Sequence, residues 1–171
     1  MVIWLIGLAG AGKTTIGREV YRRLKSRKPN VVFMDGDHVR NIMGDDLGHT
    51  VEERRTNAWR ICRLCHYLDS QDIDVVCAIL SVFHETQDWN RENNSRYFEV
   101  YIQVSMEDLI ARDQKGLYSS AASGEVKNVV GFDIPFEPPP RSDLIVANGE
   151  PFVPPSQLAD GIVAALDRTL A

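Results

Sequence analysis

The stretch Gly7-Leu8-Ala9-Gly10-Ala11-Gly12-Lys13-Thr14 decides the fold class of this chain. It follows the spacing G-x-x-x-x-G-K-[ST] in full. Glycines let the backbone close around a phosphate without clashes from Cβ atoms, and the freed amides and the next helix N-terminus face the anion. The apolar run Val2–Ile6 precedes the stretch, and a helical pattern follows it. This context favours a phosphate-binding P-loop over a chance glycine turn.

The P-loop predicts Mg·ATP as a ligand and transfer of the γ-phosphoryl group to a small acceptor. We expect Lys13 to reach the β- and γ-phosphates as a catalytic cation, and the Thr14 hydroxyl to bind Mg²⁺. ATP and Mg²⁺ are therefore the expected cofactors. The residues predicted here to bind ATP are Gly7, Gly10, Ala11, Gly12, Lys13, Thr14 and Thr15.

Short apolar runs recur along the chain and alternate with helical patterns. The runs are apolar on successive residues, which is typical of strands buried on both faces. Alternation with helices predicts right-handed crossovers and a parallel sheet. We therefore predict an α/β, P-loop kinase-like fold with a five-stranded parallel sheet, helices on both faces, and one domain over residues 1–171. The predicted strands are Val2–Ile6, Val31–Met34, Val75–Leu80, Phe98–Val104 and Leu144–Ala147.

Helix signals support the same architecture. Ser105 with Asp108 resembles a capping box that opens a short helix. Ser156 is a predicted N-cap before the last apolar stripe. Apolar residues at helical spacing are Ile16, Val20 and Leu24, then Ala58, Ile61, Cys62, Cys65 and Leu68, and finally Leu158, Ile162, Val163 and Leu166.

An acidic pair, Asp35 and Asp37, follows the second predicted strand. Ligands bind at the carboxyl ends of parallel strands. Two carboxylates there can hold Mg²⁺ or accept the proton of an acceptor hydroxyl, and Arg40 can pair with an anion. We expect Asp35 to help bind the metal and either Asp35 or Asp37 to serve as the catalytic base, the alternative being a solvated acidic turn.

The segment from Lys115 to Arg141 departs from the strand and helix rhythm. It contains Gly116, Gly124, Gly131 and several prolines, with no sustained period. A loop of this length inside a compact domain is typically a functional lid or disordered. We predict a lid at about residues 115–141.

Composition excludes several classes. The net charge of −5 argues against a nucleic-acid binder. No apolar run approaches the roughly 20 residues of a membrane span, and the N-terminal run lacks a basic leader, so the cytoplasm is expected. Three cysteines fit a reducing compartment. Cys62-Arg63-Leu64-Cys65-His66 spells the c-type haem motif, but both cysteines fall on a helix's apolar face and are predicted core residues.

Beyond the P-loop, the sequence resembles the adenylylsulfate (APS) kinase family, whose members phosphorylate the 3′-hydroxyl of adenosine 5′-phosphosulfate in sulfate assimilation. The match extends to about Val146. It includes Asp35-Gly36-Asp37, Arg40, Arg54 with Asn57, Arg112-Asp113-Gln114-Lys115-Gly116-Leu117-Tyr118, Lys127-Asn128, Gly131-Phe132-Asp133 and Pro135-Phe136-Glu137-Pro138-Pro139. The R-D-x-K-G-L-Y run with K-N and P-[YF]-E-P-P is far more specific than a P-loop alone.

The resemblance implies residue roles. Asp37 matches the family's base or metal-linked carboxylate, and Arg112 is implied to bind ATP. Lys115 and Lys127 match lid positions. The remaining acceptor positions implied by the match are Arg40, His49, Arg54, Asn57, Leu80, Ser81 and Val129. A nucleotide acceptor is thus the expected partner, and a homodimer is left open.

Two positions depart from the family. Its members carry Phe in L-G-F-S and after K-N, and these rings hold the adenine of APS; here the residues are His49 and Val129. The family's I-S-P-Y-R also reads Leu80-Ser81-Val82-Phe83-His84. Stacking on a base is worth about 1–3 kcal/mol, so APS binding is expected to weaken. Some relatives phosphorylate cytidine diphosphoramidate instead. APS remains the default acceptor; the alternatives are another nucleotide, another small metabolite, or ATP binding without catalysis.

Overall fold

The structure is a computed structural model that describes residues 1–44, 46–113 and 116–170. Its centre is a five-stranded sheet in the order β2-β3-β1-β4-β5, and every neighbouring pair is parallel. Each predicted run coincides with a strand to within one residue at either end, and the predicted α/β fold is confirmed. The strands are β1 (Val2–Ile6), β2 (Val31–Asp35), β3 (Asp74–Ile79), β4 (Tyr97–Gln103) and β5 (Leu144–Ala147).

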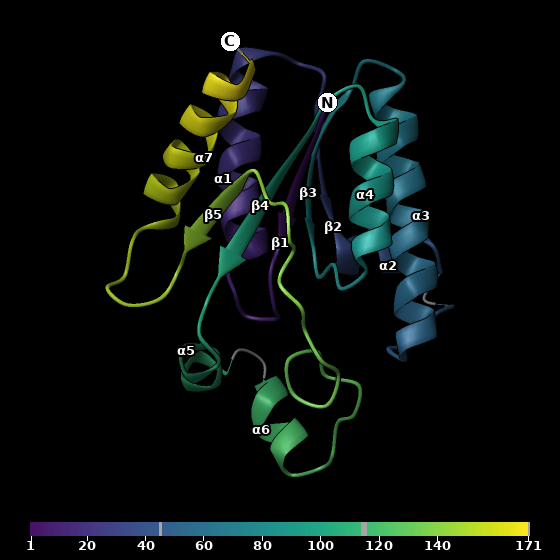
Figure 1. Ribbon diagram of the computed structural model, residues 1–171, viewed down its shortest axis with the longest axis vertical. Helices are drawn as coiled ribbons and strands as arrows, with labels where there is room; N and C mark the ends of the chain where they lie inside the picture. Colours follow the sequence, from purple (N-terminus) through teal and green to yellow (C-terminus); the bar gives the residue numbers. More distant parts are fainter. Residues whose placement is uncertain (45, 114–115, 171) are drawn as a thin grey trace.

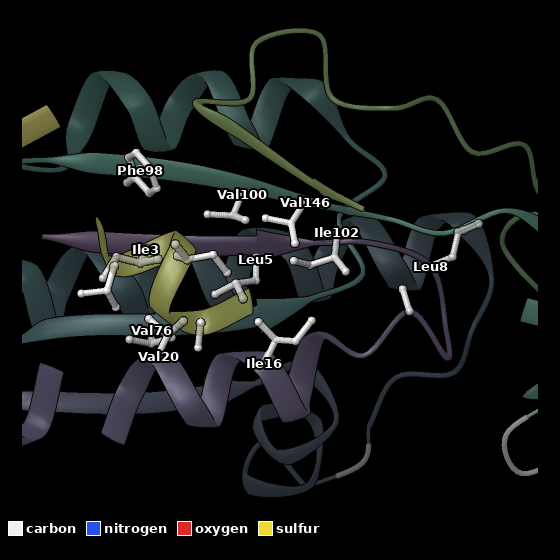
Figure 2. Packing of buried hydrophobic residues seen from close by; sticks show 14 of the residues in the cluster. Ile3, Leu5, Leu8, Ile16, Val20, Val76, Phe98, Val100, Ile102 and Val146 are labelled. Atoms are coloured by element: carbon white, nitrogen blue, oxygen red, sulfur yellow. The ribbon is translucent and has the colours of Figure 1, made fainter. Parts of the chain in front are cut away.

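Helices cover both faces of the sheet (Figure 1). On one face lie α1 (Lys13–Arg27) and α7 (Pro155–Leu170), and on the other lie α3 (Val51–Asp69) and α4 (His84–Asn93). All of β1 is buried because alternate residues enter opposite cores. Ile3 and Leu5 join the core under α1 and α7 (Figure 2), whereas Trp4 and Ile6 pack toward α3.

Three short helices, α2 (Gly36–Ile42), α5 (Met106–Arg112) and α6 (Leu117–Ala122), complete the fold. Figure 1 shows α5 and α6 beyond the carboxyl ends of the strands. Since β1 lies between β3 and β4, the P-loop emerges from the middle of this edge. The topology therefore gathers the loops that follow β1, β2 and β3 at one edge, where ligands bind in parallel sheets.

Two sequence expectations need correction. Ser156 is not the N-cap of α7, because the helix already begins at Pro155, a residue suited to the first helical position. The segment 115–141 is not wholly irregular, because it contains α6, with Tyr118 and Ala121 buried. The start of α5 is confirmed: the Ser105 hydroxyl accepts a hydrogen bond from the backbone N–H of Asp108 at 3.1 Å.

The cysteines of the C-x-x-C-H motif are core residues, as predicted. Cys62 and Cys65 are free thiols with 0% exposure. Burial raises the pKa of Cys62 to about 12, so its thiol is unreactive at neutral pH. In the described part of the chain, no helix has both the length and the apolar character to cross a membrane.

Candidate active site

The P-loop wraps from the end of β1 into the start of α1. Gly10 and Gly12 have φ of 77° and 90°, a region that disfavours side chains. Gly7 is needed for space, since a Cβ there would lie 2.8 Å from the backbone oxygen of Ile102. The glycine spacing thus follows from backbone geometry and from the close approach of β4.

Lys13 is the first residue of α1, and its Nζ donates to the backbone oxygen of Leu8 at 2.7 Å across the loop. Burial lowers the pKa of the amine to about 8, although the charges of Asp35 and Asp37 oppose the shift. The lysine is therefore a desolvated cation at neutral pH, close to two carboxylates.

Asp35 connects the P-loop to the acidic motif. Its Oδ2 accepts a hydrogen bond from the Thr14 hydroxyl at 2.6 Å, and its Oδ1 caps α2 by accepting the N–H of Asp37 at 3.0 Å. Asp35 is 9% exposed, whereas Asp37 is exposed. The structure therefore joins Thr14 and Asp35, the two predicted metal ligands. The sequence did not predict α2. Asp37 lies in the first turn of this helix and not in the solvated acidic turn that the sequence left open as an alternative.

Two arginines organise the neighbouring loops through backbone carbonyls. Arg40 donates to the oxygens of Leu47 and Gly48, each at 2.8 Å. The Arg54 guanidinium donates from Nε to the oxygen of His49 at 2.9 Å and from Nη2 to that of Asn128 at 2.7 Å. Arg54 thereby brings together the loops that carry positions 49 and 129.

Burial and like charge lower two pKa values in this region. Burial lowers the pKa of Arg54, and repulsion from Arg40 lowers it further. Desolvation lowers the pKa of the His49 imidazole, and the positive charges of Arg54 and Arg40 lower it further, so this ring is neutral at neutral pH. Two arginines and an uncharged imidazole thus belong to one region of the chain.

Asn57 lies one turn beyond Arg54 on α3, as its spacing predicted, and is 7% exposed. Its Oδ1 has no hydrogen-bond partner among the described residues. Buried polar atoms are normally paired, so this oxygen is available to accept a hydrogen bond from a donor group of a ligand. The start of α3 is fixed by a capping box between Thr50 and Glu53, a signal that the sequence interpretation overlooked.

The predicted lid contacts the P-loop. The Tyr118 hydroxyl on α6 donates to the backbone oxygen of Ala9 at 2.9 Å. Asp133 accepts the N–H groups of Asn128, at 2.7 Å, and Val129, which holds Asn128 at a positive φ of 64°. Lys127 is exposed, and Lys115 lies outside the described residues.

Other implied acceptor positions are packed closely. Val129 is 3% exposed within the α1-side core, so it offers a ligand little surface. Ser81 is 1% exposed, and its hydroxyl accepts a hydrogen bond from Gln87 at 3.3 Å. Leu80 is half-buried at the end of β3.

Arg112 reaches the same edge from the end of α5. Its Nη2 donates to the backbone oxygen of Asn148 at 2.7 Å. The Asn148 amide in turn donates to the backbone oxygen of Ala11 in the P-loop at 2.9 Å. Sequence reasoning missed Asn148; the available signal was a polar residue directly after a buried strand, at the edge where ligands bind.

A P-loop at the centre of a parallel sheet, a half-buried lysine at its end and a hydrogen bond from Thr14 to Asp35 define an ATP-dependent P-loop kinase. The family model of adenylylsulphate kinase matches residues 1–147 of the chain. The chain belongs to this family.

Individual relatives and structures agree. The chain is 42% identical over 150 residues to a cytidine diphosphoramidate kinase of Campylobacter jejuni, covering 86% of this chain and 85% of that protein. It is 40% identical over 144 residues to an adenylyl-sulfate kinase of Halothermothrix orenii, covering 84% and 78%. The Mycobacterium tuberculosis APS kinase in complex with AMPPNP and APS superposes with a TM-score of 0.88 at 27% identity, covering 97% of this chain and 96% of that one.

Proposed function

We propose that the chain transfers the γ-phosphoryl group of ATP to the 3′-hydroxyl of adenosine 5′-phosphosulfate, giving ADP and the 3′-phosphorylated product. One observation carries this proposal: Asp35 accepts hydrogen bonds both from the Thr14 hydroxyl of the P-loop, at 2.6 Å, and from the backbone N–H of exposed Asp37, at 3.0 Å, so the acidic motif is tied to the phosphate loop. An exposed carboxylate next to the phosphate loop is suitably situated to accept the proton of an attacking hydroxyl.

The proposed reaction assigns roles to the residues of the site. The acceptor oxygen bonds to the γ-phosphorus as the bond to the β-bridging oxygen breaks, and Asp37 takes the hydroxyl proton. Lys13 stabilises the charge on the transferring group. Arg40 and Arg54 hold the 5′-anion of the acceptor, Asn57 binds the acceptor through its carboxamide, and Arg112 contributes to ATP binding.

A magnesium ion fits the residues present. The Thr14 hydroxyl and the Asp35 carboxylate are hydrogen-bonded to each other and supply the oxygen donors that Mg²⁺ prefers. Bound there, Mg²⁺ would neutralise charge on the β- and γ-phosphates. Asp35 is therefore the proposed metal-linked carboxylate, which leaves Asp37 as the base.

Cytidine diphosphoramidate is the second candidate acceptor. The similarity to the Campylobacter jejuni enzyme favours it, as does the loss of both rings of the adenine clamp. With Val129 buried and His49 exposed, a base can stack on the face of His49, and a small pyrimidine needs no two-sided sandwich. The anion-binding residues serve both acceptors equally, so they do not discriminate.

An ADP-release assay with APS and cytidine diphosphoramidate as separate acceptors tests the proposal. We expect turnover with APS that falls about 10²–10³-fold in Lys13→Ala, since one charge-stabilising donor is worth that much. Turnover with cytidine diphosphoramidate alone would replace the first candidate by the second. If no ADP is released with either acceptor, both candidate acceptors are ruled out and another metabolite is favoured.

The remaining proposals concern the lid, the cellular location and the assembly of the chain. We propose that residues 115–141 act as a lid that carries Lys115 and Lys127 to the nucleotides, and that the chain works in the cytoplasm. A homodimer is the proposed assembly, which light scattering of the purified protein would test.

A further inference from the structure

Asn148 connects three parts of the ATP half of the site, although the chemistry described above assigns it no role. It follows β5 directly and is 8% exposed. Its backbone N–H donates to the oxygen of Gln103 at the end of β4 at 2.9 Å, and its backbone oxygen accepts from Arg112 at 2.7 Å. Its side chain is left to bind the P-loop, where Nδ2 donates to the Ala11 oxygen at 2.9 Å.

The contact between Asn148 and the P-loop is tight. A Cβ on Gly12 would lie 2.6 Å from Nδ2 of Asn148, so the carboxamide occupies the space that a side chain at position 12 would need. Gly12 is therefore required both by its φ of 90° and by the asparagine packed against it.

The peptide between Ala11 and Gly12 carries the consequence for ligand binding. In a planar trans peptide the carbonyl and the following N–H point in opposite directions. The bond from Asn148 holds the Ala11 carbonyl toward β5, so the Gly12 N–H points away from Asn148. Among the residues that the structure describes, this N–H has no hydrogen-bond acceptor.

We propose that Asn148 is a positioning residue for ATP, whose carboxamide fixes the Ala11–Gly12 peptide so that the Gly12 N–H binds a phosphate oxygen. The residue acts through the P-loop backbone and touches no reacting atom. This inference rests on the proposed assignment of residues 7–14 as the phosphate site.

The main test measures the binding of inorganic tripolyphosphate and ATP, each with Mg²⁺, to wild type and Asn148→Ala. Tripolyphosphate has no base or ribose, so it reports the phosphate cradle alone. Loss of one hydrogen bond with a carbonyl left unpaired predicts a rise of about 5–30-fold in both dissociation constants. The KM of the acceptor should stay unchanged, a split that a merely structural role would not produce.

Two further variants sharpen the test. Asn148→Asp keeps the size but has no N–H and places a charge beside the Ala11 oxygen, so its affinity loss should exceed that of alanine. Asn94→Ala is the matched control: Asn94 is 9% exposed and its Nδ2 donates to the backbone oxygen of Asn90 at 2.8 Å, away from the P-loop. Loss of the Asn94 side chain should leave both dissociation constants unchanged.

A measurement on the wild-type protein keeps the proposal testable if the variants do not fold. The amide resonance of Gly12 should shift on addition of tripolyphosphate, as expected for a new N–H bond to an anion. Wild type that binds tripolyphosphate with no shift at Gly12, or Asn148→Ala that binds it as tightly as wild type, would overturn the inference. Wild type that does not bind tripolyphosphate at all would instead overturn the phosphate-site assignment.

Discussion

At the scale of single residues, Lys13 makes ATP binding dependent on pH. Its pKa is lowered to about 8, so in the free protein the amine is charged below pH 8 and loses its proton above it. The dissociation constant of ATP, measured calorimetrically from pH 7 to 9.5, should therefore rise by up to about tenfold per pH unit above pH 8. Lys13→Arg keeps its charge throughout and should bind independently of pH over this range; a parallel rise in the arginine variant would contradict the assignment to Lys13.

Substitutions of Asp37 and of Asp35 should have different effects on kcat and on the KM of ATP. Asp37→Asn keeps the shape but cannot take the hydroxyl proton, so we expect kcat to fall about 10²–10⁴-fold while the KM of ATP changes little. Asp35→Asn removes the carboxylate that accepts from Thr14, and should raise the KM of MgATP as well. Near-normal turnover of Asp37→Asn in steady-state assays would move the base to Asp35.

The base-facing positions 49 and 129 should respond differently to the family's phenylalanines. His49 is exposed, so His49→Phe can add a stacking face. The added stacking should strengthen APS binding by about 1–3 kcal/mol at most and so lower the KM of APS. Val129 is buried, so Val129→Phe should overpack the core and cost about 1–3 kcal/mol of unfolding free energy. Steady-state kinetics with both acceptors check His49→Phe, and denaturant unfolding checks Val129→Phe. A higher KM for APS in His49→Phe would show that the site reads adenine in another way.

At the scale of elements, the lid can be tested by hydrogen exchange. Residues 116–141 contact the rest of the chain through polar bonds, such as Tyr118 to Ala9 and Arg54 to Asn128, and through buried apolar residues such as Val129 and Val130. Ligands that bridge these parts should slow exchange in this segment when ADP and acceptor are bound together. In free Tyr118→Phe, α6 should exchange faster than in wild type. Equal protection with and without ligands would contradict a lid.

Two of the helices that sequence reasoning overlooked, α4 and α2, lack an extended apolar face. The buried face of α4 consists of Thr86, Gln87 and Asn90, so its periodicity is not hydrophobic. In α2 the single buried residue is Val39, and the helix spans only 7 residues. Apolar periodicity finds a helix only where burial is apolar and extends over several turns. The strands were found because their burial on both faces leaves continuous apolar runs.

At the scale of the whole molecule, the sequence by itself determined the P-loop, the five strands and the family. These features are encoded by neighbours in the chain: glycine spacing sets a loop, and apolar runs set buried strands. The tertiary structure alone decided the strand order β2-β3-β1-β4-β5 and, with it, which distant residues meet. Thr14 bonds Asp35 from 21 residues away, Arg54 bonds Asn128 from 74, and Asn148 bonds Ala11 from 137. Such contacts depend on strand register and helix packing, which no local spacing specifies.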